Sequence, residues 1–245
     1  SGRRRTWPPW TSRTPGNSSA KCSQRLQQPP PSTDQVYLRT HARRYALLLE
    51  LVRGLAPERI LVVGPSYESV MLRDAVPAAR VDTLGWADHR FPRLEGERHL
   101  QHDLNDLGYP ELGAYSVIVC AEVIEHLHVP AEGILRALAG GLVAGGHLVL
   151  QTPNATALPK RVRMLGGRNP YEPMRAEPTN PGHFHEYTVG ELRKAVGAAG
   201  LEVERLITAN YFDHGSRKNR AYRALGGVLP GTLREGITIL VRRSR

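Results

Sequence analysis

The chain has 245 residues, a length that suits one α/β domain with room for an insertion. Its formal net charge is +10, but the basic excess lies mostly at the two ends, so we interpret it as solvated tails rather than a nucleic-acid-binding face. Cys22 and Cys120 do not suggest a disulfide pair, and no apolar run approaches the roughly 18 residues that span a bilayer, so we expect a cytoplasmic protein.

The first half of the chain alternates helical and strand patterns. Residues 1–33 are rich in proline, serine and arginine and are predicted to be a disordered basic tail. From about Asp34 to Gly54 apolar residues recur at helical spacing, which predicts an amphipathic helix with a stripe made of Leu38, Ala42, Tyr45, Leu49 and Val52. A buried strand is then expected at 59–63, a helix at 66–75, a weaker strand at 80–84 and a short strand from His99 into a loop.

The second half is dominated by residues 115–154. Here an apolar strand runs into a charged cluster, a helical segment follows, and a Gly145-Gly146 turn leads to a second apolar strand. This order predicts a βαβ unit, whose chemistry lies outside the carboxyl ends of its strands. Further along, Thr188 and Glu191 have the spacing of a helix capping box, and the segments 201–207 and 237–241 predict two last strands with an antiparallel finish.

Alternating strands and helices predict a mostly parallel sheet covered by helices on both faces. We expect one domain over 34–245, with lid insertions at about 155–187 and 209–234. The first insertion is rich in proline and arginine, and the second holds a basic helical stretch. Their side chains would form the rim of the site, and either grip an anionic or sugar-like acceptor or remain an ordinary charged surface: Arg161, Arg163, Arg168, Tyr171 and Arg220.

The charged cluster after the first strand of the βαβ unit is the leading catalytic candidate. Glu122, Glu125 and His126 stand at positions i, i+3 and i+4, which share one face of a helix. Two carboxylates and an imidazole on one face can hold a metal ion or move a proton. Acidic residues are also favoured at a helix start for purely structural reasons, so that alternative stays open.

Three passages, AEVIEHL, GGHLVLQTPN and GHFHEYTVGELRKAVGAAGLEVERL, resemble the second half of class I S-adenosylmethionine-dependent methyltransferases. The resemblance covers about Asp34 to Arg243. It implies a Rossmann-like sheet of seven strands, mostly parallel, with helices on both faces and an antiparallel last strand. It also implies an enzyme that uses S-adenosyl-L-methionine as its methyl donor.

The same resemblance implies where the donor would bind. The family's glycine-rich turn reads Val62-Val63-Gly64-Pro65-Ser66-Tyr67-Glu68 here, so Ser66 and Glu68 stand where glycines are expected and Val62 replaces an acidic residue. We expect Glu68 either to face the donor or to begin a helix. The acidic residue that usually meets the ribose would fall near Gly85, flanked by Asp82 and Asp88. The implied donor-binding residues are Gly64, Pro65, Ser66, Glu68, Asp103, Leu104, Cys120, Ala121 and Glu122.

A fourth residue joins the charged cluster by resemblance. Glu122, Glu125, His126 and His183 are similar to the metal site of small-RNA 3′-terminal 2′-O-methyltransferases, and ubiquinone-biosynthesis O-methyltransferases carry a similar Glu-x-x-Glu-His. The expected ion is manganese, iron or zinc, and the expected catalytic residues are Glu125, His126 and His183. His126 acting as a metal-free base is an equal alternative, and His185 and Tyr187 are weaker candidates.

The function favoured by these patterns is methyl transfer to a hydroxyl of a small-molecule or carbohydrate-like acceptor in a bacterial biosynthetic pathway. One alternative is an RNA 2′-O-methyltransferase, which would share the Glu/Glu/His/His set. Another is a non-catalytic, methyltransferase-like binding protein, motivated by the altered glycine turn. The sequence does not define the oligomeric state.

Overall fold

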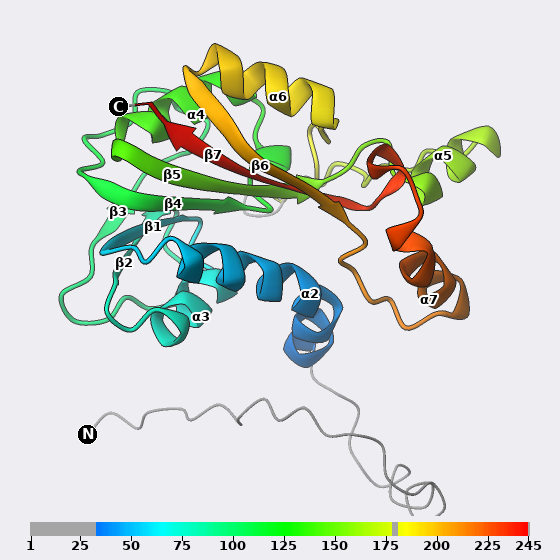
Figure 1. The fold of residues 1–245 in the computed structure, drawn as a ribbon, viewed down its shortest axis with the longest axis horizontal. Coiled ribbons are helices and arrows are strands. Elements are labelled where there is room, and N and C mark those ends of the chain that lie inside the picture. Colours follow the sequence, from blue (N-terminus) through cyan, green and yellow to red (C-terminus); the bar gives the residue numbers. More distant parts are fainter. Residues whose placement is uncertain (1–32, 178–180, 245) are drawn as a thin grey trace, which may run out of the picture. The chain divides into compact units, whose positions relative to one another are not determined.

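The computed structural model describes residues 33–177 and 181–244 (Figure 1). The predicted tail up to residue 32, with Cys22, lies outside the described residues. The chain forms two units, residues 1–37 and residues 38–245, and the sheet with its covering helices belongs to the second. None of the helices in the described part of the chain is both long and apolar enough to span a membrane.

Seven strands of the described chain form one sheet in the order β3-β2-β1-β4-β5-β7-β6. All neighbours pair in parallel except β7, which is antiparallel to both β5 and β6, so the predicted Rossmann-like sheet with an antiparallel last strand is confirmed. The strands are β1 (Arg59–Val63), β2 (Arg80–Gly85), β3 (His99–Gln101), β4 (Tyr115–Ala121), β5 (Leu142–Pro153), β6 (Leu201–Ala209) and β7 (Gly236–Arg243).

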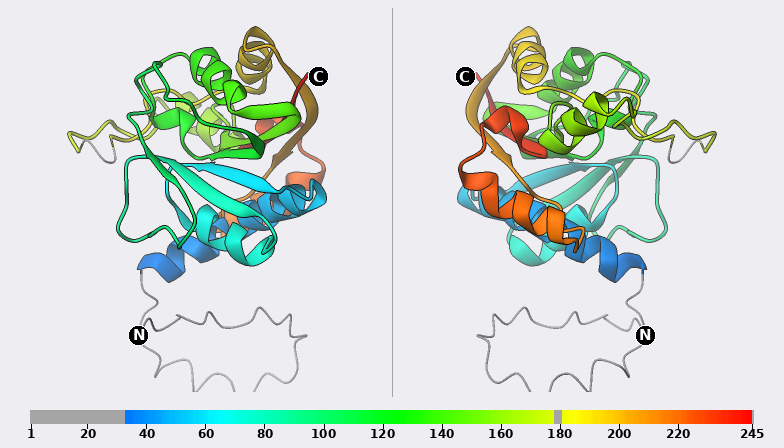
Figure 2. Two further views of the ribbon diagram at one scale, coloured as in Figure 1. Left: turned by 90° about the vertical axis from the view of Figure 1, so that its left-hand side faces the viewer. Right: turned by 90° about the vertical axis from the view of Figure 1, so that its right-hand side faces the viewer.

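Helices cover both faces of this sheet, with α4 and α6 on one face and α2 and α3 on the other (Figures 1 and 2). Two further helices follow the strand ends in the insertions, and three 3₁₀ turns complete the described elements. The helices are α2 (Thr33–Gly54), α3 (Tyr67–Ala75), α4 (Ala131–Gly140), α5 (Leu158–Leu165), α6 (Val189–Ala198) and α7 (Arg217–Ala224), and the turns are η1 (Ile124–His126), η2 (Leu225–Gly227) and η3 (Gly231–Leu233).

Each face of the sheet has its own apolar core. Leu135 and Leu138 of α4 pack with Leu192 of α6 over one face, and Leu48 and Val52 of α2 pack over the other. These side chains recur at helical spacing, so burying them holds the helices against the strands. The predicted stripe of α2 is correct at Tyr45 and Val52, but the deeply buried set also includes Arg44, Leu48 and Leu51.

Two local expectations are wrong in detail. Gly145 and Gly146 do not form a turn before a strand, because β5 runs through them with an irregular register against β4. Glu122 does not stand on a helix with His126: it has φ +54°, only η1 follows it, and α4 begins later at Ala131. The capping box at α6 is confirmed, since the Thr188 hydroxyl accepts from the Glu191 N–H and the Glu191 carboxylate accepts from the Thr188 N–H.

Candidate functional site

The chain turns sharply where β1 ends, and this turn brings two stretches of backbone together. Gly64 has φ +78°, and its N–H donates a 2.7 Å hydrogen bond to the carbonyl oxygen of Leu84. Gly85, at the end of β2, has φ +126°, and a Cβ atom there would lie 3.6 Å from the Gly64 nitrogen. Both positive φ angles favour glycine. The carboxyl ends of β1 and β2 therefore present backbone without side chains, as a close-fitting cofactor requires.

Glu68, predicted within the same turn, has a partner inside the protein. It lies in the first turn of α3, as expected, and its carboxylate pairs at 2.7 Å with the guanidinium of Arg44. Arg44 is fully buried and also donates to Gln151 Oε1 at 3.2 Å. The sequence analysis does not single out Arg44. The signal that could have identified it is a basic residue on the buried side of an amphipathic helix. Pro65 and Ser66 stay half-buried at the turn.

Neither aspartate near the end of β2 is available to meet a ribose. Asp82 is fully buried, and burial alone would raise the pKa of its carboxyl. Hydrogen bonds outweigh that effect and hold the pKa below its usual value; they come from the Arg98 N–H and the side chains of Arg80, Arg59 and Tyr115. The carboxylate of Asp88 is paired with Arg90. The expected position, Gly85, carries no side chain at all.

Asp103 and Leu104 lie in the loop that follows β3. The Asp103 side chain is exposed and accepts a 3.0 Å hydrogen bond from the Asn105 N–H, so it shapes the loop. A Cβ atom at Gly85 would lie 3.8 Å from Leu104 Cδ1, which places Leu104 beside the end of β2. The structure thus brings this predicted pair to the same strand ends as the Gly64 turn.

The end of β4 supplies the next predicted group. Cys120 is fully buried within the sheet, and burial raises the pKa of its thiol, so this side chain cannot reach a bound molecule. Ala121 and Glu122 are half-buried. Burial also raises the pKa of Glu122, against the opposing charge of Arg44. The Glu122 N–H donates to the Gln151 carbonyl at 2.8 Å, which fixes its left-handed backbone.

Three of the four predicted metal ligands converge. Glu125, His126 and His183 each offer a ligand atom, and these atoms all lie within 4.8 Å of one another. Glu122 is outside this group. The Phe184 N–H donates to the Glu125 carbonyl at 2.8 Å, and the His126 and His183 rings meet edge to face at 4.7 Å between centroids. These contacts tie the η1 turn to the loop before α6, two segments far apart in the sequence.

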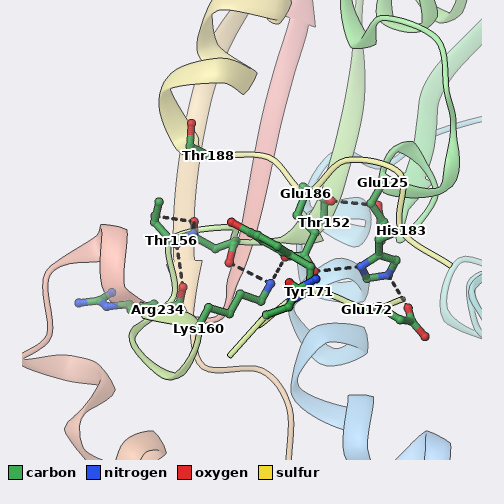
Figure 3. Close-up of polar contacts among 12 residues, drawn as sticks. Glu125, Thr152, Thr156, Lys160, Tyr171, Glu172, His183, Glu186, Thr188 and Arg234 are labelled. Carbon is green, nitrogen blue, oxygen red and sulfur yellow. Dashed lines mark hydrogen bonds and ion pairs between the residues drawn. The ribbon is translucent and has the colours of Figure 1, made fainter. Parts of the chain in front are cut away.

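Glu125 is buried with half of its carboxylate unsatisfied. Its Oε2 accepts a 2.9 Å hydrogen bond from the Thr152 hydroxyl, while Oε1 has no hydrogen-bond partner among the described residues (Figure 3). Burial, followed by the nearby Glu122 charge, raises the pKa of Glu125 well above its usual value. A buried carboxylate oxygen without a partner is costly, so this atom marks a place where a proton or a cation binds.

Both histidines of the site are oriented through Nδ1. His126 Nδ1 lies 2.9 Å from the carbonyl oxygen of Gly182, and His183 Nδ1 lies 3.0 Å from Glu186 Oε1. Because both partners are acceptors, Nδ1 carries the hydrogen in each neutral ring and Nε2 keeps its lone pair. Burial lowers the pKa of His126 below its usual value and that of His183 to about 4, so both rings are neutral at pH 7.

Lys160 of α5 supports this arrangement from the insertion. Its ammonium pairs with Glu186 (Figure 3) and donates to the Asn154 carbonyl at 3.1 Å. Burial lowers the pKa of Lys160 to about 8, although the nearby carboxylates oppose that shift. The ion pair fixes Glu186 against His183. Lys160 stands in a run of basic residues, and the sequence gives no sign that it differs from its neighbours.

The weaker candidates flank this cluster, since the His185 N–H donates to the Glu125 carbonyl oxygen at 3.3 Å. His185 is more than half exposed and contacts Glu191 at 3.3 Å, and the ring of Tyr187 is buried beside it. The predicted rim side chains are on the surface, and α5 buries none of its own residues. All five are exposed: Arg161, Arg163, Arg168, Tyr171 and Arg220.

A parallel sheet whose strand order reverses between β1 and β4, followed by an antiparallel β7, is the framework of the Rossmann-like methyltransferases, and the Gly64 turn and the Glu122–His126 segment follow the carboxyl ends of the two strands at that reversal. Residues 39–206 match the family model described as a methyltransferase domain, so the chain belongs to this family. It is an S-adenosylmethionine-dependent methyltransferase.

Curated and solved relatives agree with this assignment. The chain is similar to the ubiquinone biosynthesis O-methyltransferase of Acinetobacter baumannii, with 24% identity over 174 residues, 66% of this chain and 71% of the relative. Its fold is similar to N-methyltransferase NodS of Bradyrhizobium japonicum solved with S-adenosyl-l-homocysteine (TM-score 0.54, 14% identity, 87% and 94% of the two chains). It is also similar to magnesium protoporphyrin IX methyltransferase of Synechocystis with the same ligand (TM-score 0.55, 14% identity, 91% and 92%).

Proposed function

We propose that the protein transfers the methyl group of S-adenosyl-L-methionine to a hydroxyl of a small-molecule or carbohydrate-like acceptor in a bacterial biosynthetic pathway. The observation that carries this proposal is the convergence of Glu125, His126 and His183 around a buried, unsatisfied carboxylate oxygen. A hydroxyl nucleophile must lose a proton, and this cluster offers the groups that take it. The curated O-methyltransferase relative supports the same choice of acceptor atom.

The chain's own residues divide the work between two places. The bare backbone at Gly64 and Gly85, with Ser66, Leu104 and Ala121 around it, fits the donor, whose bound form supplies an electrophilic methyl group. The cluster then holds the acceptor oxygen in line with that methyl group. His126 Nε2, left with its lone pair by the contact of Nδ1 with the Gly182 carbonyl, accepts the acceptor's proton.

The same cluster fits a divalent ion. Carboxylate and imidazole ligands suit manganese, iron or zinc, the two Nε2 atoms keep their lone pairs, and Glu125 Oε1 has no other partner in the described structure. Glu125, His126 and His183 would hold the ion, which when bound lowers the pKa of a coordinated hydroxyl. With the ion bound, the side chains of the cluster would still fix the acceptor's position.

A direct test combines donor turnover with ion removal. Formation of S-adenosyl-L-homocysteine is followed with a panel of phenolic, catecholic and sugar acceptors, using protein before and after chelation. We expect Glu125→Gln to lower kcat by roughly 10²-fold or more, as loss of a catalytic acid–base or ligand group does. Glu132→Gln, an exposed glutamate in the first turn of α4, serves as the matched control and should leave kcat unchanged.

The outcomes separate the two roles of the cluster. Activity that disappears on chelation and returns with added manganese or zinc supports the ion. Activity that survives chelation but needs His126 supports the metal-free base. If Glu125→Gln and His126→Asn both keep full activity, the cluster is structural and the proposal fails.

An RNA 2′-O-methyltransferase is the second candidate, because residues 161–169, with Arg161, Arg163 and Arg168, are all exposed and contain no acidic residue. Contacts between these arginines and phosphates would make RNA binding fall steeply with salt. Fluorescence anisotropy with a labelled short RNA tests this: no binding at low salt excludes it.

A further inference from the structure

The helix α5 of the first insertion turns an apolar face to solvent. All eight of its residues lie in the described part of the chain, and none of them is buried. Leu158, Val162 and Leu165 stand at positions i, i+4 and i+7, which share one face of a helix. Val162 is 58% exposed and Leu165 is 90% exposed. Because an amphipathic helix normally buries such a face, this one is available to another surface.

Positive charge borders this apolar face. Arg161 and Arg163 belong to α5, Arg168 follows it, and no acidic residue occurs from 155 to 171. Residues 161–169 are all exposed, so these arginines reach solvent. Charge alone suits any polyanion. Apolar side chains between the arginines add to binding only where the partner also offers an apolar region.

The second insertion adds a similar face at the same end of the sheet. Its turn η2 leaves Leu225 52% exposed, and Val228, directly after that turn, is 81% exposed. The two insertions are joined at their bases, because the Thr156 hydroxyl and the Asn154 amide donate to the Thr232 carbonyl oxygen at 2.9 and 3.2 Å. Figure 1 shows α5 and α7 beyond the same end of the sheet. Three exposed cations lie on α7: Arg217, Lys218 and Arg220.

An anionic lipid bilayer matches both parts of this surface. Its phosphate headgroups attract arginine and lysine, and the boundary beneath them receives the apolar side chains of a helix that lies in the interface plane. RNA would match the charges alone, since α5 has no aromatic side chain to stack a base. The exposure of Val162 and Leu165 therefore favours a bilayer over RNA for this face.

The opposite side of α5 joins the candidate site. Lys160, two residues from both Leu158 and Val162, points away from the apolar face and pairs with Glu186. The Glu186 carboxylate in turn lies 3.0 Å from His183 Nδ1. Binding through the apolar face would therefore bring the Glu125 cluster close to the lipid headgroups.

We propose that α5, together with the turn at 225–228, docks on the surface of an anionic lipid bilayer. Arg161 and Arg163 contact the headgroups, and Val162 and Leu165 enter the boundary between headgroups and acyl chains. The docking surface lies outside the catalytic cluster, so the inference holds whichever acceptor the enzyme methylates.

Co-sedimentation of the full-length protein with vesicles tests the proposal. Vesicles of phosphatidylcholine and phosphatidylglycerol in equal parts should bind the protein, and vesicles of phosphatidylcholine alone should not. We expect Val162→Gln/Leu165→Gln to weaken binding to the anionic vesicles by roughly tenfold or more. Arg161→Gln/Arg163→Gln should weaken it at low salt by about fivefold for each charge removed.

Two matched variants leave α5 unchanged. Val143→Gln alters an apolar residue, 38% exposed, near the start of β5, whereas α5 follows its end. Arg193→Gln/Lys194→Gln removes two exposed charges from α6. Both should bind the anionic vesicles as the unaltered protein does. These comparisons are needed because the N-terminal tail is also basic, so vesicle binding by itself does not assign the contact to α5.

The outcomes are distinct. Absence of binding to the anionic vesicles overturns the proposal, and so does a Val162→Gln/Leu165→Gln variant that binds them as tightly as the unaltered protein. Weakening by the arginine variant alone would indicate a polyanion such as RNA, which anisotropy with a labelled RNA then detects, and would also overturn the bilayer. Equal weakening by the matched variants would do the same. Melting temperatures, expected to match for all variants, exclude unfolding as the cause.

Discussion

At the scale of single residues, the role of each buried polar side chain follows from the partners that it contacts. Asp82 is buried and hydrogen-bonded to groups at the amino ends of β1, β2 and β4, and Glu68 is buried against the guanidinium of Arg44, so both carboxylates have partners and stabilise the fold. Glu125 is buried with one carboxylate oxygen that has no hydrogen-bond partner among the described residues, and this difference is why we propose a chemical role for Glu125 and a structural one for the other two.

Glu235 gives a prediction about pH. Burial raises the pKa of its carboxyl to about 7, so the folded protein holds this proton over a range in which the unfolded chain has lost it. Stability from this group is therefore present at low pH and is lost as the pH rises from about 4.5 toward 7. Glu235→Gln should raise the melting temperature at pH 8 relative to the unaltered protein, and the gain should vanish near pH 4.5.

Calorimetric melting at several pH values checks this prediction, with Glu132→Gln as the exposed control. A gain that is the same at every pH would mean that the effect comes from packing and not from the ionised carboxylate. A lower melting temperature at pH 8 would mean that the ionised carboxylate stabilises the fold, most directly by accepting the 3.3 Å hydrogen bond from the Phe212 N–H.

At the scale of elements, periodicity predicts the helices and strands that bury one or both of their faces. The short helix α5 buries none of its residues and has no such face. The same periodicity cannot predict η1, a single turn whose shape follows from the positive φ of Glu122 and from the loop that packs on it. Sequence motifs place Glu125, His126 and His183 together. Lys160 is connected to this cluster through its ion pair with Glu186, and no sequence pattern predicts that contact.

The capping box of α6 gives a prediction at this scale. Thr188 accepts a hydrogen bond from the Glu191 N–H at 3.2 Å, and α6 begins directly after the loop that carries His183. Thr188→Ala should lower the free energy of unfolding by about 1 kcal/mol, measured by chemical denaturation. Lys194→Ala, an exposed change in the same helix, should have an effect within about 0.5 kcal/mol of zero. Equal effects of the two changes would contradict a role for the cap.

At the scale of the whole molecule, the strand order determines where the chemistry lies. The order reverses between β1 and β4, so the chain leaves those neighbouring strands in opposite directions and their carboxyl ends stay uncovered. The Gly64 turn follows one of these strands and the Glu122–His126 segment follows the other. The order of sequence patterns is enough to predict this arrangement.

Donor binding can be tested as a property of the folded molecule. A ligand that binds only the folded state at a hundredfold excess over its Kd stabilises that state by about 2.7 kcal/mol, so S-adenosyl-L-homocysteine should raise the melting temperature. Gly64→Val should abolish that ligand-dependent shift, because valine at φ +78° is strained and adds a side chain to the turn. Gly96→Val is the matched control: Gly96 has φ +82° and open space around it, so the strain is similar but lies in another loop. Both variants should melt earlier without ligand, and only Gly96→Val should keep the shift. No shift in the unaltered protein, even at high ligand concentration, would favour a methyltransferase-like binding protein over an enzyme.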